Sequence, residues 1–288
     1  MRALMGHPAA RWAGGLLSLA ALIWLAIEAR ARWQAVDGSA LTTEVWTTAA
    51  AGAVAIGAAY ILQALNWRDL VRSFVRDPEL RGTPLVRSSM VTQVAKYLPG
   101  NVAHLAGRHM QATSLGVPHG ALGKALGSEI AILLGGALLV VLAAVGFLPT
   151  AFVIEGVSLR PLALAALGGV VLVCLFIGWR GGQVLLLLLA RAVGWMTVFA
   201  AAFWLLLDAI YPVSIGSALA AAAIGWAVGF ATPGSPGGIG TREGAMTLML
   251  SPSVPLEALL PALALFRLVT VGADLVCFAI GRAMGKDD

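Results

Sequence analysis

Seven apolar runs of membrane-spanning length constrain this chain more than any other feature. They lie at residues 13–29, 45–66, 128–148, 161–179, 184–210, 215–232 and 256–281. A helix needs roughly 20 mostly apolar residues to cross the hydrocarbon core of a bilayer. Only 11% of the 288 residues are charged, whereas a soluble domain carries about 25%. We therefore predict an all-α, polytopic integral membrane helical bundle that forms one domain over residues 1–288.

The basic residues predict how this bundle is oriented. Six of them lie between residues 66 and 96, where only three acidic residues occur. The positive-inside rule places such a loop in the cytoplasm, and the N-terminus with Arg2 and Arg11 is then cytoplasmic too. We expect the first apolar run to be retained as a span, because no small-residue cleavage site follows it. The predicted location is a bacterial-type cytoplasmic (inner) membrane.

Three of these basic residues, Arg68, Arg72 and Arg76, recur at intervals of four and would form one stripe on a helix. Apolar residues fill the other side of that helix, which predicts an amphipathic helix lying at the cytoplasmic interface. One interpretation is a topological anchor. The other is a collar that attracts anionic lipid head groups.

Small residues predict close helix packing. Gly225 and Gly229 are four residues apart, as are Gly281 and Gly285, and residues 49–59 are nearly all small. Such faces allow helix backbones to approach closely in lipid.

Two further apolar stretches, residues 90–118 and 233–250, are interrupted by Pro and Gly. Proline removes a backbone donor, and the unpaired groups at membrane depth are tolerated only against protein or a water-filled cavity. The two interruptions are about half the chain apart, and such pairs point to the substrate site of a transporter. Two ordinary surface loops are the alternative. The expected hinge residues are Pro99, Gly100, Pro236, Gly237 and Gly238.

The number of spans depends on the second interrupted stretch. If residues 233–250 form a re-entrant segment, seven spans place the C-terminus outside. If they cross as a broken helix, eight spans place it inside. The sequence thus predicts seven or eight transmembrane helices.

Charged residues inside or beside the apolar runs are the third signal. At the bilayer centre each costs roughly 2.5–3.5 kcal/mol on insertion scales, so it must be paired, reach the interface or face water. Arg267 and Asp274 are two helical turns apart and share one face, for which Glu129, Arg108 and Arg242 are candidate partners. Either a static ion pair or a charged cavity for a lipid head group or a proton fits this pattern. The charges are Glu129, Arg191, Arg242, Glu243, Arg267 and Asp274.

Other chemistries find little support in the sequence. His104, His109 and His119 lie near the first interrupted stretch, but no further ligand at a suitable spacing suggests a metal site. Cys174 and Cys277 lie in apolar runs and are expected to be buried hydrophobic residues. No nucleophile with an adjacent base, nucleotide loop or basic-aromatic surface is evident. We expect no catalytic residues, no cofactor, no metal and no nucleic-acid partner.

Two motifs suggest a family. KYLPGNVAHLAGR at 96–108, followed by LGVP and the span that opens with Ser128-Glu129, and later PGGIGTREGA at 236–245, resemble the lysylphosphatidylglycerol synthase transmembrane (flippase-like) family. The resemblance covers roughly residues 10–285. It implies a membrane domain that moves lipids between leaflets, which in bifunctional members is aminoacylated phosphatidylglycerol. The residues that match the motifs of the family are Lys96, Pro99, Gly100, Asn101, Arg108, Glu129, Pro236, Gly237, Gly238, Arg242 and Glu243.

We therefore predict a lipid flippase or transporter for a phospholipid or glycolipid. The sequence stops at Asp288 without a soluble synthase domain, so a stand-alone member is expected. A non-transporting subunit or scaffold for a lipid-modifying enzyme or glycosyltransferase is the alternative, whereas a lipid enzyme lacks the necessary residues. Membrane phospholipids or a lipid-linked substrate are the expected partners. The predicted substrate-binding residues are Lys96, Asn101, Arg108, Glu129, Arg242, Glu243, Arg267 and Asp274.

Overall fold

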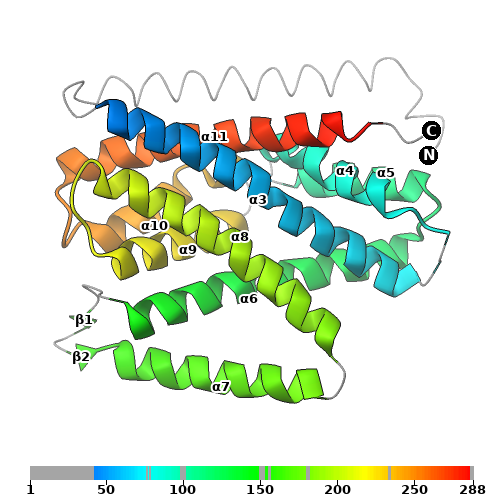
Figure 1. Ribbon diagram of the computed structural model, residues 1–288, viewed down its shortest axis with the longest axis horizontal. Helices are drawn as coiled ribbons and strands as arrows, with labels where there is room; N and C mark the ends of the chain where they lie inside the picture. The colour runs from blue at the N-terminus through cyan, green and yellow to red at the C-terminus, as the bar shows by residue number, and fades with distance from the viewer. Residues whose placement is uncertain are drawn as a thin grey trace.

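The computed structural model describes residues 42–75, 77, 79–97, 102–148, 153–154, 157–179, 182–232 and 235–285. This part of the chain is all-α apart from one short β-hairpin (Figure 1). Its helices are α3 (Thr43–Val75), α4 (Gly82–Thr92), η2 (Gln93–Tyr97), α5 (Ala103–Ser114), α6 (His119–Phe147), α7 (Arg160–Trp179), α8 (Gln183–Asp208), α9 (Ile215–Ala231), η3 (Pro236–Gly238), α10 (Thr241–Leu250) and α11 (Leu256–Ala283), where η marks a 3₁₀-helix. The strands β1 (Val153–Ile154) and β2 (Val157–Ser158) pair antiparallel between α6 and α7.

Four helices, α3, α6, α8 and α11, are long and apolar enough to cross a membrane. They extend from one end of the bundle to the other, with α8 crossing α6 obliquely, and α7 runs beside α6 at the edge of the bundle (Figure 1). Only 33–50% of the residues in their most apolar windows are buried, so much apolar surface faces outward, as it does in proteins surrounded by lipid. The prediction of a multi-pass helical membrane protein is confirmed at this level. The predicted run at 13–29 lies outside the described residues.

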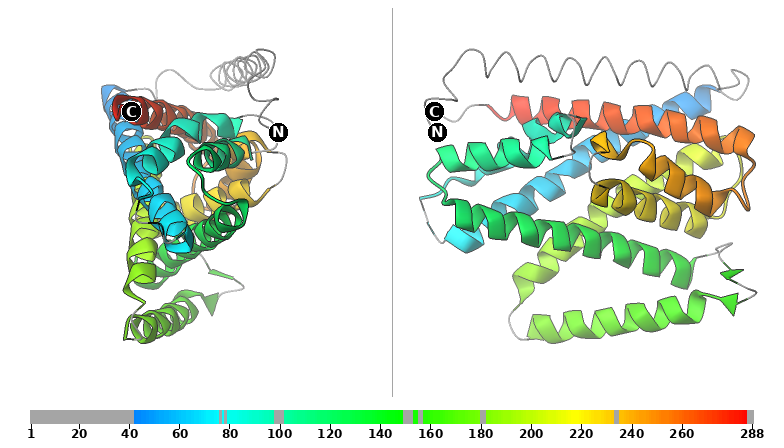
Figure 2. Two further views of the ribbon diagram at one scale, coloured as in Figure 1. Left: turned by 90° about the vertical axis from the view of Figure 1, so that its right-hand side faces the viewer. Right: turned by 180° about the vertical axis from the view of Figure 1, so that it is seen from behind.

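The two interrupted stretches form helical hairpins. The arms of the first are α4 and α5, joined through η2, and the arms of the second are α9 and α10, joined through η3. The hairpins enter the bundle from opposite ends, and η2 contacts η3 near its middle (Figure 2). The longest arm, α9, has 17 residues and measures about 25 Å, less than the roughly 30 Å of a bilayer core. The predicted full span at 215–232 is thus one hairpin arm.

The structure also corrects the loop predicted between residues 66 and 96, because the first part of this segment is helical. Helix α3 continues without a break to Val75, and Trp67 and Val71 are buried within it. The sequence has no proline from Thr43 to Asp77, so no helix-breaking proline interrupts α3. Arg68 and Arg72 therefore belong to the end of a long helix and not to a separate interfacial helix, whereas Arg76 lies outside the described residues.

Glycine allows three of the closest helix contacts. A Cβ atom on Gly57 of α3 would lie 2.6 Å from Cβ of Val276 on α11. One on Gly225 of α9 would lie 2.4 Å from Cγ of Met246 on α10. The predicted pair at Gly225 and Gly229 therefore packs the second hairpin together. Gly281 likewise lies against Met90, with a Cβ distance of 2.8 Å.

In the other predicted small-residue pair, Gly281 packs against a neighbouring helix but Gly285 does not. Gly285 has open space around it and a φ of +74°. It follows the end of α11 in a left-handed conformation, which suits glycine at the end of a helix. Its role is to end the helix and not to pack against a neighbour.

Candidate functional site

A polar cavity lies where the two hairpin tips meet. Its volume is about 70 Å³, and one water molecule needs about 10–15 Å³ of such space, so it has room for several. Residues from α3, α6, α8 and α11 complete its wall. The polar and aromatic lining residues are Tyr60, Gln63, Gln93, Lys96, His104, Arg108, Glu129, Trp195, Phe199, Trp226, Phe230, Arg242 and Thr270.

Arg108 and Glu129 form a two-point ion pair at this cavity. Nη1 of Arg108 donates to Oε1 of Glu129 at 2.9 Å, and Nη2 contacts Oε2. Both side chains are buried, and the guanidinium lies 4.5 Å from the ring centroid of Trp67. The pair joins α5 to α6. Paired, hydrogen-bonded charges of this kind are the form in which ions are tolerated in a protein interior.

Lys96 and Asp274 form the second pair. The ammonium of Lys96 lies 2.7 Å from Oδ1 of Asp274 and donates to the hydroxyl of Tyr60 at 3.0 Å. The hydroxyl of Tyr97 donates to the other carboxylate oxygen at 2.5 Å. Helix η2 places Lys96 and Tyr97 side by side, and Asp274 lies on α11 with only 1% of its surface exposed.

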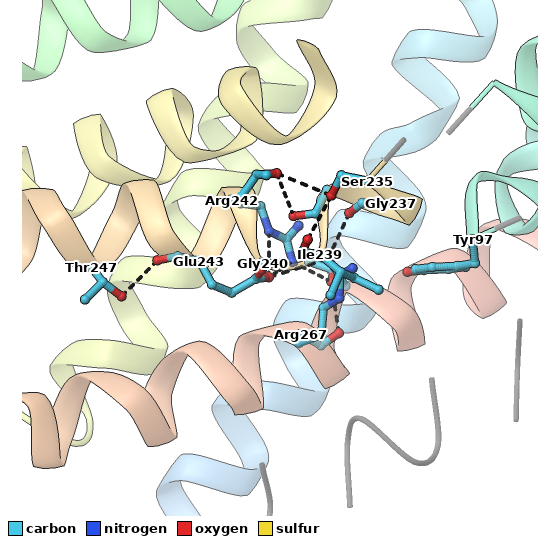
Figure 3. Close-up of polar contacts among 12 residues, drawn as sticks. Tyr97, Ser235, Gly237, Ile239, Gly240, Arg242, Glu243, Thr247 and Arg267 are labelled. Atoms are coloured by element: carbon cyan, nitrogen blue, oxygen red, sulfur yellow. Dashed lines mark hydrogen bonds and ion pairs between the residues drawn. The ribbon is translucent and has the colours of Figure 1, made fainter. Parts of the chain in front are cut away.

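The third cluster gathers Arg242, Glu243 and Arg267 (Figure 3). Oε1 of Glu243 lies 3.3 Å from Nη2 of Arg242 and 3.6 Å from Nη1 of Arg267. Oε2 of Glu243 accepts from the backbone N–H of Gly240 at 2.7 Å, which caps the start of α10. Nη1 of Arg267 also donates to the carbonyl oxygen of Gly237 at 2.9 Å. Helix α11 is thereby fastened to the tip of the second hairpin.

The intramembrane charges are expected to be paired, to reach the interface or to face water, and in the structure each of the six lies in an ion pair. The ion pairs of Arg267 and Asp274 are with Glu243 and Lys96, which are not among the candidate partners. Glu129 and Arg108 bind each other, and Glu243 lies between Arg242 and Arg267 and pairs with both. Helix periodicity places two residues on one face but does not determine which neighbouring helix approaches that face.

One of the predicted intramembrane charges neither lines the cavity nor binds a residue that does, and one predicted substrate-binding residue lies outside the described part of the chain. Arg191 lies away from the cavity and pairs with Asp69 at 2.6 Å. Asn101 lies outside the described residues, as do the hinge residues Pro99 and Gly100. The other predicted substrate-binding residues either line the cavity or bind a residue that does.

The charges of the three clusters sum to an excess of one positive charge. Four cations, Lys96, Arg108, Arg242 and Arg267, face three carboxylates, Glu129, Glu243 and Asp274, so 4 − 3 = +1 with His104 neutral.

Several buried donors around the cavity also have no partner within the described part of the chain. They include Nε of Arg108 and Nε1 of Trp195, and Nδ1 of His104 is unpartnered as well. Unsatisfied buried donors are costly and often indicate an unseen water or ligand. The cavity therefore has the charge and the free donors to accept an anionic oxygen.

Sequence reasoning missed the uncharged part of the wall. Tyr60, Trp195 and Thr270 occur within apolar runs, where aromatic and hydroxyl residues are unremarkable. Tyr97 carried a weak signal, since it directly follows Lys96 in the first motif. The chain has only three tyrosines, and two of them bind the Lys96–Asp274 pair.

The histidines and cysteines considered in the sequence lie in different settings. His109 and His119 stack with ring centroids 5.2 Å apart at an exposed position. Among the described residues no group of three metal-ligating side chains comes together. Cys277 is buried, with Sγ 3.6 Å from the carbonyl oxygen of Met90, and the side chain of Cys174 is outside the described part.

Comparison with protein-family models, with curated proteins and with solved structures finds no match to this chain. The family resemblance of the two motifs stays a prediction. What the protein does is therefore inferred from its cavity, charges and hairpins.

Proposed function

We propose that this protein is a lipid flippase, which moves a lipid with a polar head group between the two leaflets of a membrane. The observation that carries the proposal is the polar cavity at the meeting point of two short-armed hairpins that enter from opposite ends (Figure 2). The head group would occupy the cavity while the acyl chains stay among the outward-facing apolar side chains.

The hairpins support transport because the regular helix of their arms gives way to the short 3₁₀-helices η2 and η3 near the middle of the bundle. Such breaks at membrane depth are stable where they line a hydrated cavity, and broken segments in two halves form the substrate site in many transporters. Movement of either tip would open the cavity toward one end of the bundle. Two tips from opposite ends offer one gate for each side.

The charge of the cavity favours a phosphate-containing head group. The clusters carry a charge of +1, which attracts the negative charge of a phosphodiester. Arg242 is bound less tightly than Arg108, because its contacts with Glu243 and Thr270 are 3.3 and 3.4 Å long. A phosphate beside Arg242 would form shorter charge-assisted hydrogen bonds than these.

The distribution of charge supports an orientation as well. At the end of the bundle where α3 meets α4 and where α11 ends, basic side chains exceed acidic ones, while the opposite end carries more acidic ones. The positive-inside rule makes the first end cytoplasmic. Its basic residues are Arg68, Arg72, Arg81, Arg87, Lys124 and Arg282, against Asp69, Asp77 and Glu79, and the opposite end has Arg160 against Glu44, Asp208 and Glu257.

In this orientation five helices cross the membrane and the hairpins are re-entrant. The crossing helices are α3, α6, α7, α8 and α11. With the apolar run at 13–29 as a further span, the total is six, in place of the seven or eight expected from the sequence. The N-terminus stays cytoplasmic, and the C-terminus is then cytoplasmic as well.

Lipid transport can be tested in proteoliposomes that contain a fluorescent phospholipid with its label on the head group. Quenching of the outer leaflet with an impermeant reductant measures how fast the inner-leaflet lipid becomes accessible. We expect transport by the wild type, and a loss of at least tenfold in the variant that combines Arg242→Ala with Glu129→Gln. Arg191→Ala is the matched control, because it removes a half-buried, ion-paired arginine outside the cavity and leaves Asp69 paired with Arg68.

The outcomes separate the alternatives. Undiminished transport by the double variant would contradict the assigned site. An inactive wild type that co-purifies with a stoichiometric lipid-modifying enzyme or glycosyltransferase would favour a scaffold instead. Faster transport of neutral glycolipids than of phospholipids would contradict the phosphate assignment alone.

A further inference from the structure

Lys96 stands between the cavity and a carboxylate that does not reach it. Its side chain lines the cavity, whereas its ammonium is bound to Asp274 at 2.7 Å. Asp274 is not among the lining residues and is almost completely buried. An anion that enters the cavity and Asp274 therefore compete for the same cation.

The groups around Asp274 determine what happens if it loses this cation. From η2 it faces Lys96 and Tyr97, and from α3 Tyr60 lies beside Lys96. On its own helix the neighbours are Arg267 and Cys277, and Arg242 of α10 acts on the same cluster from further away. Tyr97 can donate one hydrogen bond but cannot supply a charge.

The other two buried carboxylates of the described residues face guanidinium groups, whereas the ion pair of Asp274 is with one lysine. Glu129 is bound through both oxygens by Arg108. Glu243 receives the backbone N–H of Gly240 and lies near two arginines. Among these three carboxylates, Asp274 is thus the one that lies outside the cavity wall and whose ion pair is with a single residue, which belongs to that wall.

We propose that binding of a lipid phosphate at Lys96 is linked to the uptake of one proton by Asp274. The phosphate oxygen takes over the ammonium of Lys96, and a proton from water converts the Asp274 carboxylate to the neutral acid. The phosphate brings one negative charge and the proton one positive charge, so the charge of the cluster stays at +1. This inference rests on the proposed function and adds a coupling ion to it.

The physical reason is the cost of a buried unpaired charge. A carboxylate left in a protein interior without its cation is strongly destabilised, and uptake of a proton removes that cost. The phosphate adds a second negative charge nearby, which acts in the same direction. Because linkage is reciprocal, acid conditions should strengthen lipid binding, and lipid release should return the proton.

The test uses the purified full chain in detergent and a short-chain, water-soluble phosphatidylglycerol as the probe. Calorimetric titrations in two buffers of different ionisation enthalpy give the number of protons taken up per bound lipid. We expect close to one proton for the wild type, and an affinity that increases by up to about tenfold for each unit of falling pH in the linked range. A short-chain diacylglycerol, which lacks the phosphate, should cause no uptake.

The variant Asp274→Asn tests whether Asp274 is the group that takes up the proton. We expect this variant to bind the probe with an affinity that does not change with pH and without proton uptake. Asp69→Asn is the matched control, because Asp69 is likewise an ion-paired aspartate in a long helix but its arginine partners lie outside the cavity, and it should behave as the wild type does. The wild-type titrations need no variant, so a poorly folded Asp274→Asn protein leaves them intact.

The possible outcomes distinguish a failure of the linkage from a failure of the proposed function. Binding of the probe by the wild type without proton uptake would overturn the linkage and leave the proposed function standing. Uptake that persists in Asp274→Asn would overturn the assignment to Asp274. Failure of the wild type to bind any phospholipid would overturn both the linkage and the phosphate-binding cavity on which it rests.

Discussion

Arg108 of the first hairpin and Glu129 of α6 hold each other through two parallel contacts, although both are buried and both line the cavity. The pair therefore connects a hairpin arm to a membrane-spanning helix at the position where substrate would bind. It also compensates both charges within the protein.

Glu129→Gln should destabilise the protein more than removal of both charges does. The single change leaves a buried arginine without its partner, which typically costs about 3–5 kcal/mol. In Arg108→Met combined with Glu129→Leu, apolar side chains of similar size replace both ions, and most of that loss should be recovered. Thermal unfolding in detergent measures the difference. A double variant as unstable as the single one would show that the pair is not the source of the loss.

Gly57→Ala should weaken the contact between α3 and α11. The added Cβ atom would lie 2.6 Å from Val276 Cβ and 2.8 Å from the carbonyl oxygen of Ala273, and the backbone oxygen cannot rotate away. Overpacking of this kind costs about 1–3 kcal/mol. Gly168→Ala on α7 is the control, since no atom lies within 4 Å of the new Cβ atom. Equal melting temperatures for the two variants would argue against this helix crossing.

Gly238→Ala should disturb the tip of the second hairpin. Gly238 has a φ of +72°, where an alanine costs about 1–2 kcal/mol, and a new Cβ atom would lie 3.0 Å from Cα of Gly229. We expect lower stability and slower lipid transport in the proteoliposome assay. Gly244→Ala, within α10 and with open space around it, should change neither. Normal transport by Gly238→Ala would mean that the tip tolerates displacement.

Cysteine labelling should place Ser114 and Ser251 on opposite sides of the membrane. Both are exposed, and they lie at the outer ends of the first and second hairpins. In a background with Cys174→Ala and Cys277→Ala, an impermeant maleimide added to whole cells should label Ser251→Cys and not Ser114→Cys. Permeabilised cells should show labelling of both. Labelling of both in intact cells would contradict the two opposed hairpins.

Much of the site could be predicted from the sequence because its residues lie beside helix breakers or inside apolar runs. A charge such as Glu129 stands out in an apolar run, since its burial has to be compensated. Tyr60 and Thr270 could not be recognised in this way, because a hydroxyl in an apolar helix costs little and is common. The end of α3 was mistaken for a loop because its arginines resemble an interfacial stripe, although no residue there stops the helix.

The sequence by itself determined that the chain is helical and membrane-embedded, and that two broken segments and several buried charges require an internal explanation. Only the tertiary structure decided which charges meet. Lys96 and Asp274 are 178 residues apart and come together because η2 packs against α11. Apolar periodicity acts within one helix, whereas the pairing of charges depends on which helices become neighbours, and that is decided by the packing of small residues and hairpin tips along the whole chain.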